Sequence, residues 1–421
     1  MNRESFMSSF NEIFNHVNSI GKDDNGGITR LAYSEEEAQA KEYLKNYALE
    51  LGLHASIDGV GNLWIRKEGT KPNLPSILVG SHLDTVPNGG RFDGSLGVIL
   101  GIEILKDFAE GGFINTHPIE IIAFAAEESS RFNVSTIGSK ILSNKLYMDD
   151  LKKIKDINNV SIYDAIIENG YTPENCKLID PNEYKAFLEV HIEQNNILEE
   201  EGQKIGIVEA IAAPSRFKIS LIGESAHSGA CPMGARKDAL AAAAEIILAI
   251  EHIGIKESIH KTVTTVGACK AFPGSMNVVP GKTEFLLDIR GIEKESIKRT
   301  IDQVLTTVKT ISIKRDIQFL FEFLGNEIPS HMNSDINYLI ETVCVDEKIP
   351  YRRMISGAGH DSMNMATIIP TSLIFIPCFK GISHNKEEFA SDEDIYTSAK
   401  VLSSCLKKLS GEPNNTAEIN A

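Results

Sequence analysis

Seven histidine and carboxylate side chains stand out because each lies in a short apolar or glycine-rich segment, and the segments are spread along the chain. They are His82, Asp84, Asp93, Glu127, Glu128, His191 and His384. Imidazole and carboxylate groups are the usual ligands of zinc and its first-row neighbours, and an acid beside such a metal can take the proton of an attacking water. The set therefore predicts a hydrolase that uses two metal ions.

The first histidine and the first aspartate of this set follow an apolar run and are two residues apart. If the strand continues, His82 and Asp84 point to the same side of it. The carboxylate of Asp84 could then hold the second ring nitrogen of His82, which fixes the tautomer of a metal-binding histidine. An ordinary polar pair is the alternative for this motif alone.

Asp93 lies in a glycine-rich loop, Asn88–Gly97, whose glycines allow tight turns and close backbone approach. A carboxylate held there could bridge two metal ions. The same residue could instead cap the helix expected after Gly94, because aspartate is favoured at helix N-termini.

Glu127 and Glu128 follow the continuous apolar run Ile119–Ala125, which places them at the carboxyl edge of a sheet, where open α/β folds bind ligands. Two buried neighbouring carboxylates repel each other unless cations are present. Because successive side chains diverge, we expect one acid to bind metal and the other to handle a proton. A solvated acidic loop is the alternative. His191 and His384 also follow apolar strands, and each alone could be an ordinary buried histidine.

Apolar residues at helical spacing predict helices, and short β-rich runs predict strands. Helices are expected at Phe6–Val17, Ala38–Leu51, Leu96–Phe108, Ile162–Asn169, Asp335–Val345 and Ser391–Leu409. Strands are expected at Ser56–Arg66, Ser76–Gly80, Ile119–Ala125, Phe187–His191 and Ser372–Pro377. The order strand, helix, strand favours an α/β fold with a largely parallel sheet.

The pattern changes between the two blocks that carry candidate metal ligands. The expected elements there are a strand at Phe217–Ile222, a helix at Ala235–Ile253, strands at Thr262–Val266 and Thr283–Arg290, and a helix at Glu293–Ser312. This β-α-β-β-α order predicts an inserted α+β domain at 214–328 within a metallohydrolase domain formed by 1–213 and 329–421. A chain of 421 residues is also too long for one compact core.

The formal charge of −16 and the pI near 5.2 argue against nucleic acid or an anionic membrane as a partner. A small anionic substrate would therefore need a local arginine. The six cysteines lie far apart without CxxC spacing, so we expect buried free thiols and no cysteine zinc site. No segment resembles a secretory signal or a membrane span, so we expect a cytoplasmic protein.

Eight motifs follow one another along nearly the whole chain. They are Gly80-Ser-His-Leu-Asp-Thr-Val86, Gly90-Arg-Phe-Asp-Gly94, Glu127-Glu-Ser-Ser-Arg-Phe132, His191-Ile-Glu-Gln194, Ala226-His-Ser-Gly-Ala-Cys-Pro-Met233, Arg236-Lys-Asp-Ala239, Ser356-Gly-Ala-Gly-His-Asp361 and Gly381-Ile-Ser-His-Asn385. In these motifs the chain resembles the N-carbamoyl-L-amino acid hydrolase and allantoate amidohydrolase branch of the M20 metallopeptidase family.

The resemblance implies a centre of two divalent ions, with Zn²⁺ the expected metal and Mn²⁺, Co²⁺ or Ni²⁺ as alternatives. It implies that the ions are shared by His82, Asp93, His191, Glu128 and His384, with Asp93 bridging. Glu127 would be the general base that activates a water and later protonates the leaving nitrogen. Asp84 would orient His82.

The resemblance also implies contacts to the substrate. In the inserted domain, His227 would reach the active site of a partner subunit and stabilise the carbonyl oxygen as it becomes anionic, so that a homodimer is required. Asn277 would hydrogen-bond the substrate, and Arg290 would bind its carboxylate in bidentate fashion. The other residues expected to line the pocket are Gln194, near the ureido group, and Ala358 and His360 in the loop Gly357–His360.

The predicted reaction is hydrolysis of a linear amide C–N bond in an N-carbamoyl acid, such as an N-carbamoyl-L-amino acid, allantoate or ureidopropionate. An aminopeptidase, a dipeptidase or an N-acyl amino acid deacylase with the same metals is the alternative. An inactive metal-binding scaffold is a more distant one, because such a scaffold has no use for an acid like Glu127 that is not a ligand. Ser228 and the pair Ala230-Cys231 depart from the residues usual in the family, which affects the shape of the dimer-facing turn.

Overall fold

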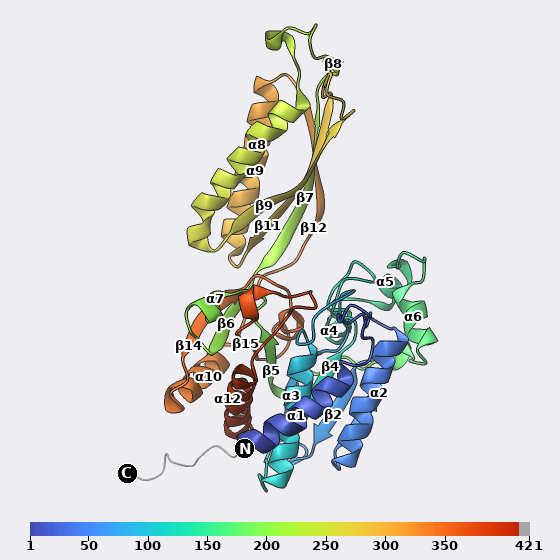
Figure 1. The fold of residues 1–421 in the computed structure, drawn as a ribbon, viewed down its shortest axis with the longest axis vertical. Coiled ribbons are helices and arrows are strands. Elements are labelled where there is room, and N and C mark those ends of the chain that lie inside the picture. The colour runs from blue at the N-terminus through green and yellow to red at the C-terminus, as the bar shows by residue number, and fades with distance from the viewer. Residues whose placement is uncertain (412–421) are drawn as a thin grey trace. The chain divides into compact units, whose positions relative to one another are not determined.

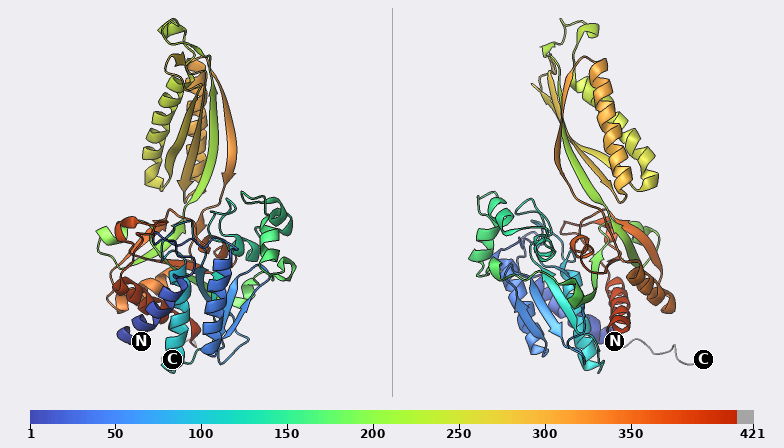
Figure 2. Two further views of the ribbon diagram at one scale, coloured as in Figure 1. Left: turned by 45° about the vertical axis from the view of Figure 1, so that its right-hand side comes forward. Right: turned by 180° about the vertical axis from the view of Figure 1, so that it is seen from behind.

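The computed structural model describes residues 1–411, and the chain divides into two compact units (Figures 1 and 2). Unit 1 comprises residues 1–209 and 332–421, of which 412–421 lie outside the described residues, and unit 2 comprises residues 210–331. The sequence places the boundaries after residues 213 and 328, so unit 2 is somewhat longer at both ends than the expected insert.

Unit 1 is built on a sheet whose four central strands are parallel. In spatial order they are β4 (Ile119–Phe124), β3 (Ser76–His82), β5 (Tyr184–Ile192) and β15 (Thr371–Ile376). The sheet continues beyond β4 with β2 (Leu63–Lys67) and β1 (His54–Ile57), and beyond β15 with β6 (Ile205–Ile211) and β14 (Tyr351–Ser356). The predicted α/β fold with a largely parallel sheet is confirmed, although the stretch expected as one strand at Ser56–Arg66 is the hairpin β1-β2.

The central strands are continuous apolar runs because both faces of the sheet are buried. Along β3, Ile77 and Val79 belong to one core cluster and Leu78 to another on the opposite face. The first cluster contains side chains of α1 (Arg3–Val17), α2 (Glu35–Glu50), α3 (Ser95–Glu110), α10 (Ser334–Asp346) and α12 (Asp392–Ser410). The second contains side chains of α4 (Ile137–Leu142) and lies against α11 (Ser362–Met365).

Three short helices of unit 1 lie outside these layers. They are α5 (Met148–Lys153), α6 (Ile162–Glu168) and α7 (Ile197–Glu200). Ser161 caps α6, since its hydroxyl accepts the N–H of Asp164.

Unit 2 is an antiparallel sheet with two helices on one face (Figure 2). The strand order is β12 (Gln318–Asn326), β7 (Ala213–Ile222), β11 (Lys282–Gly291) and β9 (Val263–Phe272), and the helices are α8 (Ala239–Glu257) and α9 (Lys294–Lys314). The predicted β-α-β-β-α order is present, but β12 adds a strand that the sequence did not indicate, because its apolar residues do not alternate with polar ones. The helix expected from Ala235 begins at Ala239, since Asp238 accepts the N–H groups of its first turn.

Two small strand pairs complete unit 2. β8 (Ala226–His227) pairs with β10 (Val278–Val279), and β13 (Ser330–His331) pairs with the last residues of β6. All six cysteines of the chain are free, as predicted, but the expected burial holds for only three of them, Cys344, Cys378 and Cys405.

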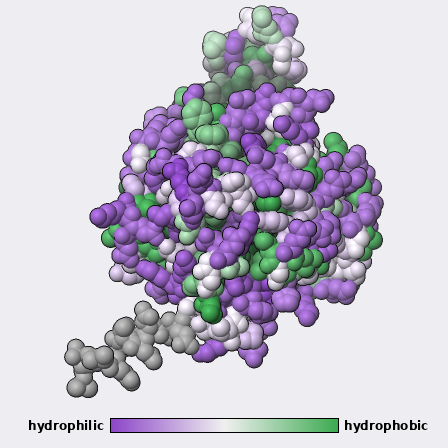
Figure 3. All heavy atoms as spheres, turned by 60° about the horizontal axis from the view of Figure 1, so that its bottom comes forward, coloured by the Kyte–Doolittle hydropathy of each residue, from purple (hydrophilic) through white to green (hydrophobic). Residues whose placement is uncertain are grey.

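The face of the molecule in Figure 3 is mainly hydrophilic, with hydrophobic side chains in small scattered groups. Among residues 1–411, none of the helices combines the length and the apolar composition that crossing a bilayer requires.

Candidate metal centre

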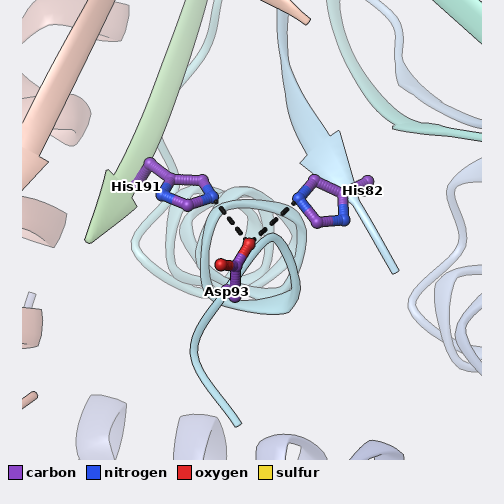
Figure 4. A group of neighbouring side chains, drawn as sticks. All are labelled: His82, Asp93 and His191. Carbon is purple, nitrogen blue, oxygen red and sulfur yellow. Dashed lines mark hydrogen bonds and ion pairs between the residues drawn. The ribbon is translucent and has the colours of Figure 1, made fainter. Parts of the chain in front are cut away.

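Three of the predicted ligands meet where β3 and β5 end (Figure 4). His82 is the last residue of β3, His191 lies near the end of β5, and Asp93 is in the loop that leads into α3. The Nε2 atoms of both imidazoles lie 3.2 Å from Oδ1 of Asp93. All three side chains are buried. They are close because neighbouring parallel strands bring their carboxyl ends to the same edge of the sheet.

The second oxygen of Asp93 faces another pair of predicted ligands. His384 Nε2 lies 3.3 Å from Asp93 Oδ2 and 3.2 Å from Glu128 Oε1. Asp93 thus belongs to two groups of possible metal ligands, and within each group the ligand atoms lie within 4.8 Å of one another. The groups are His82, Asp93 and His191, and Asp93, Glu128 and His384. Only His384 is exposed, so the centre is accessible to solvent on its side.

Hydrogen bonds to backbone carbonyls fix the two buried imidazoles. Nδ1 of His82 lies 2.9 Å from the carbonyl oxygen of Asp84, and Nδ1 of His191 lies 2.9 Å from that of Ile192. A carbonyl can only accept, so each Nδ1 carries the proton and each neutral Nε2 presents its lone pair toward Asp93. Lone pairs and a carboxylate oxygen repel at such distances unless a cation lies among them. The donor set therefore fits a divalent metal ion.

The same geometry favours protonated imidazoles whenever no metal is bound. Burial alone would lower the pKa values of His82 and His191, but Asp93 and other nearby carboxylates raise both above the usual range. Hydrogen bonds to Asp93 and Glu128 raise the pKa of His384 to about 11. Metal binding at these groups would therefore release protons.

Asp84 holds the two adjacent acids rather than the ring of His82. Its carboxylate oxygens accept the backbone N–H groups of Glu127, at 3.0 Å, and Glu128, at 2.9 Å. The same carboxylate lies 3.7 Å from Nδ1 of His82, beyond hydrogen-bond distance. The expected link from Asp84 to His82 is thus made by the backbone carbonyl of Asp84 and not by its carboxylate.

Glu127 is the acid that belongs to neither group of ligands. Its carboxylate lies 3.8 Å from Nε2 of His82, whereas that of Glu128 faces His384. Burial raises the pKa of Glu127 well above its usual value, and the charge of Glu128 adds to this rise. Ala126, with φ of 54°, turns the chain just before the two acids. The two carboxylates therefore have different surroundings, as the sequence led us to expect.

Two of the alternative interpretations are wrong. Asp93 does not cap α3, because Gly94 is the N-cap residue and no side chain accepts from the first turn. Gly94 has a φ of 68°, and a Cβ there would overlap the imidazole of His82, so the position requires glycine. Glu127 and Glu128 are each only 7% exposed and do not form a solvated acidic loop.

Two predicted pocket residues of unit 1 also lie at the centre. Gln194 donates from Nε2 to Oδ2 of Asp93 at 2.7 Å, and its buried Oε1 has no hydrogen-bond partner within residues 1–411. The ring of His360 packs edge-on against that of His191, with centroids 4.5 Å apart, and its buried Nε2 likewise has no partner there. Burial lowers the pKa of His360 well below its usual value, so this imidazole is neutral. Ala358 is half-buried and hydrogen-bonds the hydroxyl of Ser356 through its own N–H and carbonyl.

The profile of peptidase family M20/M25/M40 matches residues 78–408. The chain belongs to this family. It is 39% identical to the N-carbamoyl-L-amino-acid amidohydrolase of Pseudomonas sp. (strain NS671), over 92% of this chain and 94% of that protein. It is 36% identical to the allantoate amidohydrolase of Escherichia coli (strain K12), over 96% of this chain and 98% of that protein.

Among solved structures, an amidase of the hydantoinase/carbamoylase family from Burkholderia multivorans matches with a TM-score of 0.91 and 29% identity, over 98% of this chain and 99% of that one. The predicted M20 family, its carbamoylase and allantoate amidohydrolase branch, and the prediction of an enzyme of the amidohydrolase type are confirmed. The M20 family is metal-dependent, and the two ligand groups around Asp93 are where this M20 chain could bind ions.

The three residues of unit 2 that were predicted to contact the substrate do not form one cluster in this M20 chain. His227 in β8 is paired with Val278, and the N–H of Ser228 donates to the carbonyl of Asn277, so His227 and Asn277 share one tip of the unit. Arg290 lies toward the opposite end of β11, whose first residue, Lys282, is next to that tip. The strand from residue 282 to 290 spans roughly 26 Å at 3.3 Å per residue.

The surroundings of these residues differ as well. His227 is exposed, and its Nδ1 accepts the N–H groups of Gly229 and Ala230, so a neutral ring carries its proton on Nε2. Asn277 is exposed. Arg290 is partly buried and donates from Nε to Asp288 at 3.0 Å.

Two polar residues of the centre were missed in the sequence. The hydroxyl of Ser383 lies 3.0 Å from Asp93 Oδ2 and 3.0 Å from Oε2 of Glu388, which is buried. Ser383 is part of the motif around His384, which could have indicated it. Glu388 lies in the charged stretch Lys386-Glu-Glu, which is typical of a solvated turn and gives no local signal of burial.

Proposed function

We propose that this M20-family enzyme hydrolyses the linear amide C–N bond of an N-carbamoyl acid with a free carboxylate, with two divalent ions as cofactors. The observation that carries the proposal is the position of Asp93. Its two oxygens face two separate groups of ligands, beside an acid, Glu127, that belongs to neither group. The names of the similar amidohydrolases support a ureido compound as the substrate.

His82, Asp93 and His191 would hold one ion, and Asp93, Glu128 and His384 would hold the other. When bound, the ions would polarise the substrate carbonyl and make a water more acidic. Zinc suits this mixture of imidazole and carboxylate donors, although manganese, cobalt or nickel would accept the same donors.

Glu127 would manage the protons of the reaction. It would take a proton from the attacking water and pass it to the nitrogen that leaves. Glu127 belongs to neither ligand group, which supports this role, because a carboxylate that binds a metal ion is a weaker base. The released carbamate decomposes, so one ureido group and one water yield an amine, ammonia and carbon dioxide.

The free polar atoms at the centre suit a ureido group. The buried Oε1 of Gln194 could accept an N–H of the substrate, and the neutral His360 lies beside His191 with Nε2 unused within the described chain. In unit 2, Nε2 of His227 could donate to the carbonyl oxygen as it becomes anionic. Arg290 would bind the carboxylate, with Asn277 as a further hydrogen-bonding group.

The separation of the predicted substrate contacts within unit 2 supports a homodimer. His227 and Asn277 lie at one end of the unit and Arg290 lies toward the other, roughly 26 Å apart by the length of β11. One unit cannot bring both ends to a single small substrate. Two copies of the chain could, if one copy supplies Arg290 and the other supplies His227 and Asn277.

The test is a substrate panel on enzyme stripped of metal and reloaded with Zn²⁺ alone. The panel pairs N-carbamoyl-L-amino acids with their N-acetyl counterparts and with dipeptides, and adds allantoate and ureidopropionate. We expect kcat/KM for the best ureido acid to exceed that for its N-acetyl counterpart by at least about 100-fold, because a site built to hydrogen-bond N–H groups rejects analogues that lack them. The opposite ranking would identify a deacylase or dipeptidase.

A further inference from the structure

One buried carboxylate joins the two loops that carry Asp93 and His384. Glu388 is only 3% exposed. Its Oε1 accepts the backbone N–H groups of Phe92, at 2.7 Å, and of Asp93, at 3.0 Å. Its Oε2 lies 3.0 Å from the hydroxyl of Ser383, the residue before His384. A single side chain therefore ties the backbone of the shared aspartate to the segment that supplies His384.

The same network orients the carboxylate of Asp93. Gln194 donates to Oδ2 of Asp93 at 2.7 Å, and the hydroxyl of Ser383 lies 3.0 Å from the same oxygen. This is the oxygen that faces His384. Because these contacts are made to Oδ2, losing them would first disturb the ligand group that contains His384.

The packing around Glu388 leaves this arrangement little freedom. A Cβ at Gly90 would overlap the carboxyl group of Glu388. The ring of Phe389 packs edge-on against that of Phe92, with centroids 6.0 Å apart. Gln194 and His384 have φ values of 57° and 54°, and such conformations persist only where the surroundings determine them.

We propose that Glu388 is a positioning residue for the ion site formed by Asp93, Glu128 and His384. It contacts neither the substrate nor an ion, and it acts by holding two ligand loops together. The proposal rests on the two-ion centre of the proposed function. The other ion site depends less on Glu388, because His82 and His191 are held by their own strands and by local carbonyls.

The experiment measures bound zinc per chain for the wild type and for Glu388→Ala, without substrate, by titration and by elemental analysis after dialysis. We expect Glu388→Ala to keep one tightly bound ion and to bind the second about 10- to 100-fold more weakly, the usual effect of removing a partner outside the ligand set. Turnover should fall at limiting zinc and recover as zinc is raised. Glu388→Gln should lie between, since an amide oxygen still accepts the two N–H groups but the amide nitrogen accepts nothing from Ser383.

Two further variants complete the design. Glu387→Gln changes the neighbouring exposed glutamate and should behave like the wild type. Gly90→Ala should displace the carboxyl of Glu388, because the added Cβ would overlap it, and should weaken binding of the same ion. If Glu388→Ala does not fold, Glu388→Gln and Gly90→Ala carry the test.

The proposal would be overturned if the Glu388 variants bound both ions with wild-type affinity. It would also be overturned if the affinities for the two ions fell equally. A wild-type chain that binds only one ion would overturn it together with the two-ion centre. A wild-type chain that binds two ions but hydrolyses no ureido acid would overturn the proposed substrate and leave the role of Glu388 intact.

Discussion

The candidate metal centre of unit 1 is buried except at His384 and is fixed by hydrogen bonds, whereas the substrate-binding candidates of unit 2 are exposed or lie at opposite ends of their unit. In unit 1, carbonyls fix the rings of His82 and His191, and Asp84 fixes the backbone of Glu127 and Glu128. In unit 2, by contrast, the imidazole of His227 is exposed and its Nδ1 accepts N–H groups from its own turn, at Gly229 and Ala230.

Unit 1 thus carries the groups proposed for the chemical step, and unit 2 carries groups proposed to recognise the substrate. The groups that would bind ions and move protons are complete within one unit and need no rearrangement. The substrate groups of unit 2 would be assembled around the substrate by a second copy in the proposed dimer, whereas Gln194 and His360 already lie at the centre. Substitutions in unit 1 should therefore change metal content or proton transfer, and substitutions in unit 2 should leave the metal content unchanged.

The largest effect is expected for Asp93→Ala. It removes the residue that both ligand groups share. The affinity for both ions should therefore fall, and turnover should fall by more than about 10⁴-fold. Bound metal and kcat are measured on the same preparation. Asp302→Ala, at an exposed position of α9, is the control. Normal metal content in Asp93→Ala would contradict the shared role of Asp93.

Glu127→Gln tests the division of labour between the two adjacent acids. Both ions should remain, and kcat should fall by about 10²- to 10⁴-fold, the usual contribution of a general acid or base. Glu128→Gln is the matched variant one residue away, and it should lose affinity for one ion. Full activity of Glu127→Gln would show that the proton is handled elsewhere.

His227→Gln tests whether recognition requires a second copy. Metal content should be normal and kcat should fall by about 10²- to 10³-fold, as for removal of one donor to an oxyanion. His260→Gln, at another histidine of unit 2 whose side chain is 44% exposed, should have no effect.

Mixing two inactive variants tests directly whether His227 acts on the site of the partner. If His227 acts on the site of the partner, a hybrid of His227→Gln with Glu127→Gln contains one intact site. Random exchange of subunits then restores about a quarter of the wild-type activity, because half of the dimers are hybrids with one working site of two. No recovery in verified hybrids would mean that His227 serves the site of its own chain.

The clustering of the candidate ligands could be predicted from the sequence because each lies beside an apolar strand or in a glycine turn, and parallel strands bring such ends together. The roles of Asp84 and Glu388 could not be predicted in this way. Whether a carbonyl or a carboxylate holds His82 depends on the turn after β3. Glu388 accepts hydrogen bonds from Phe92 and Asp93, far away in the sequence, and such a contact leaves no periodicity near Glu388. The strand β12 was missed for a related reason, since apolar residues on both of its faces hide the alternation.

The smallest effect is expected for Arg290→Lys, which keeps a charge but loses the planar fork that matches a carboxylate. Metal content and kcat should be near the wild-type values, and KM for a ureido acid should rise about ten- to thirty-fold, the lower end of the range for a hydrogen bond to a charged group, because lysine keeps the charge. Arg299→Lys on α9 is the control. A change in the substrate provides the stronger comparison. When the substrate carboxylate is replaced by an amide, the affinity of the wild type should fall, whereas the already weaker affinity of Arg290→Lys should fall by a much smaller factor. If both enzymes lose the same factor, Arg290 does not contact the carboxylate, and the end of unit 2 near Arg290 would have no part in recognition.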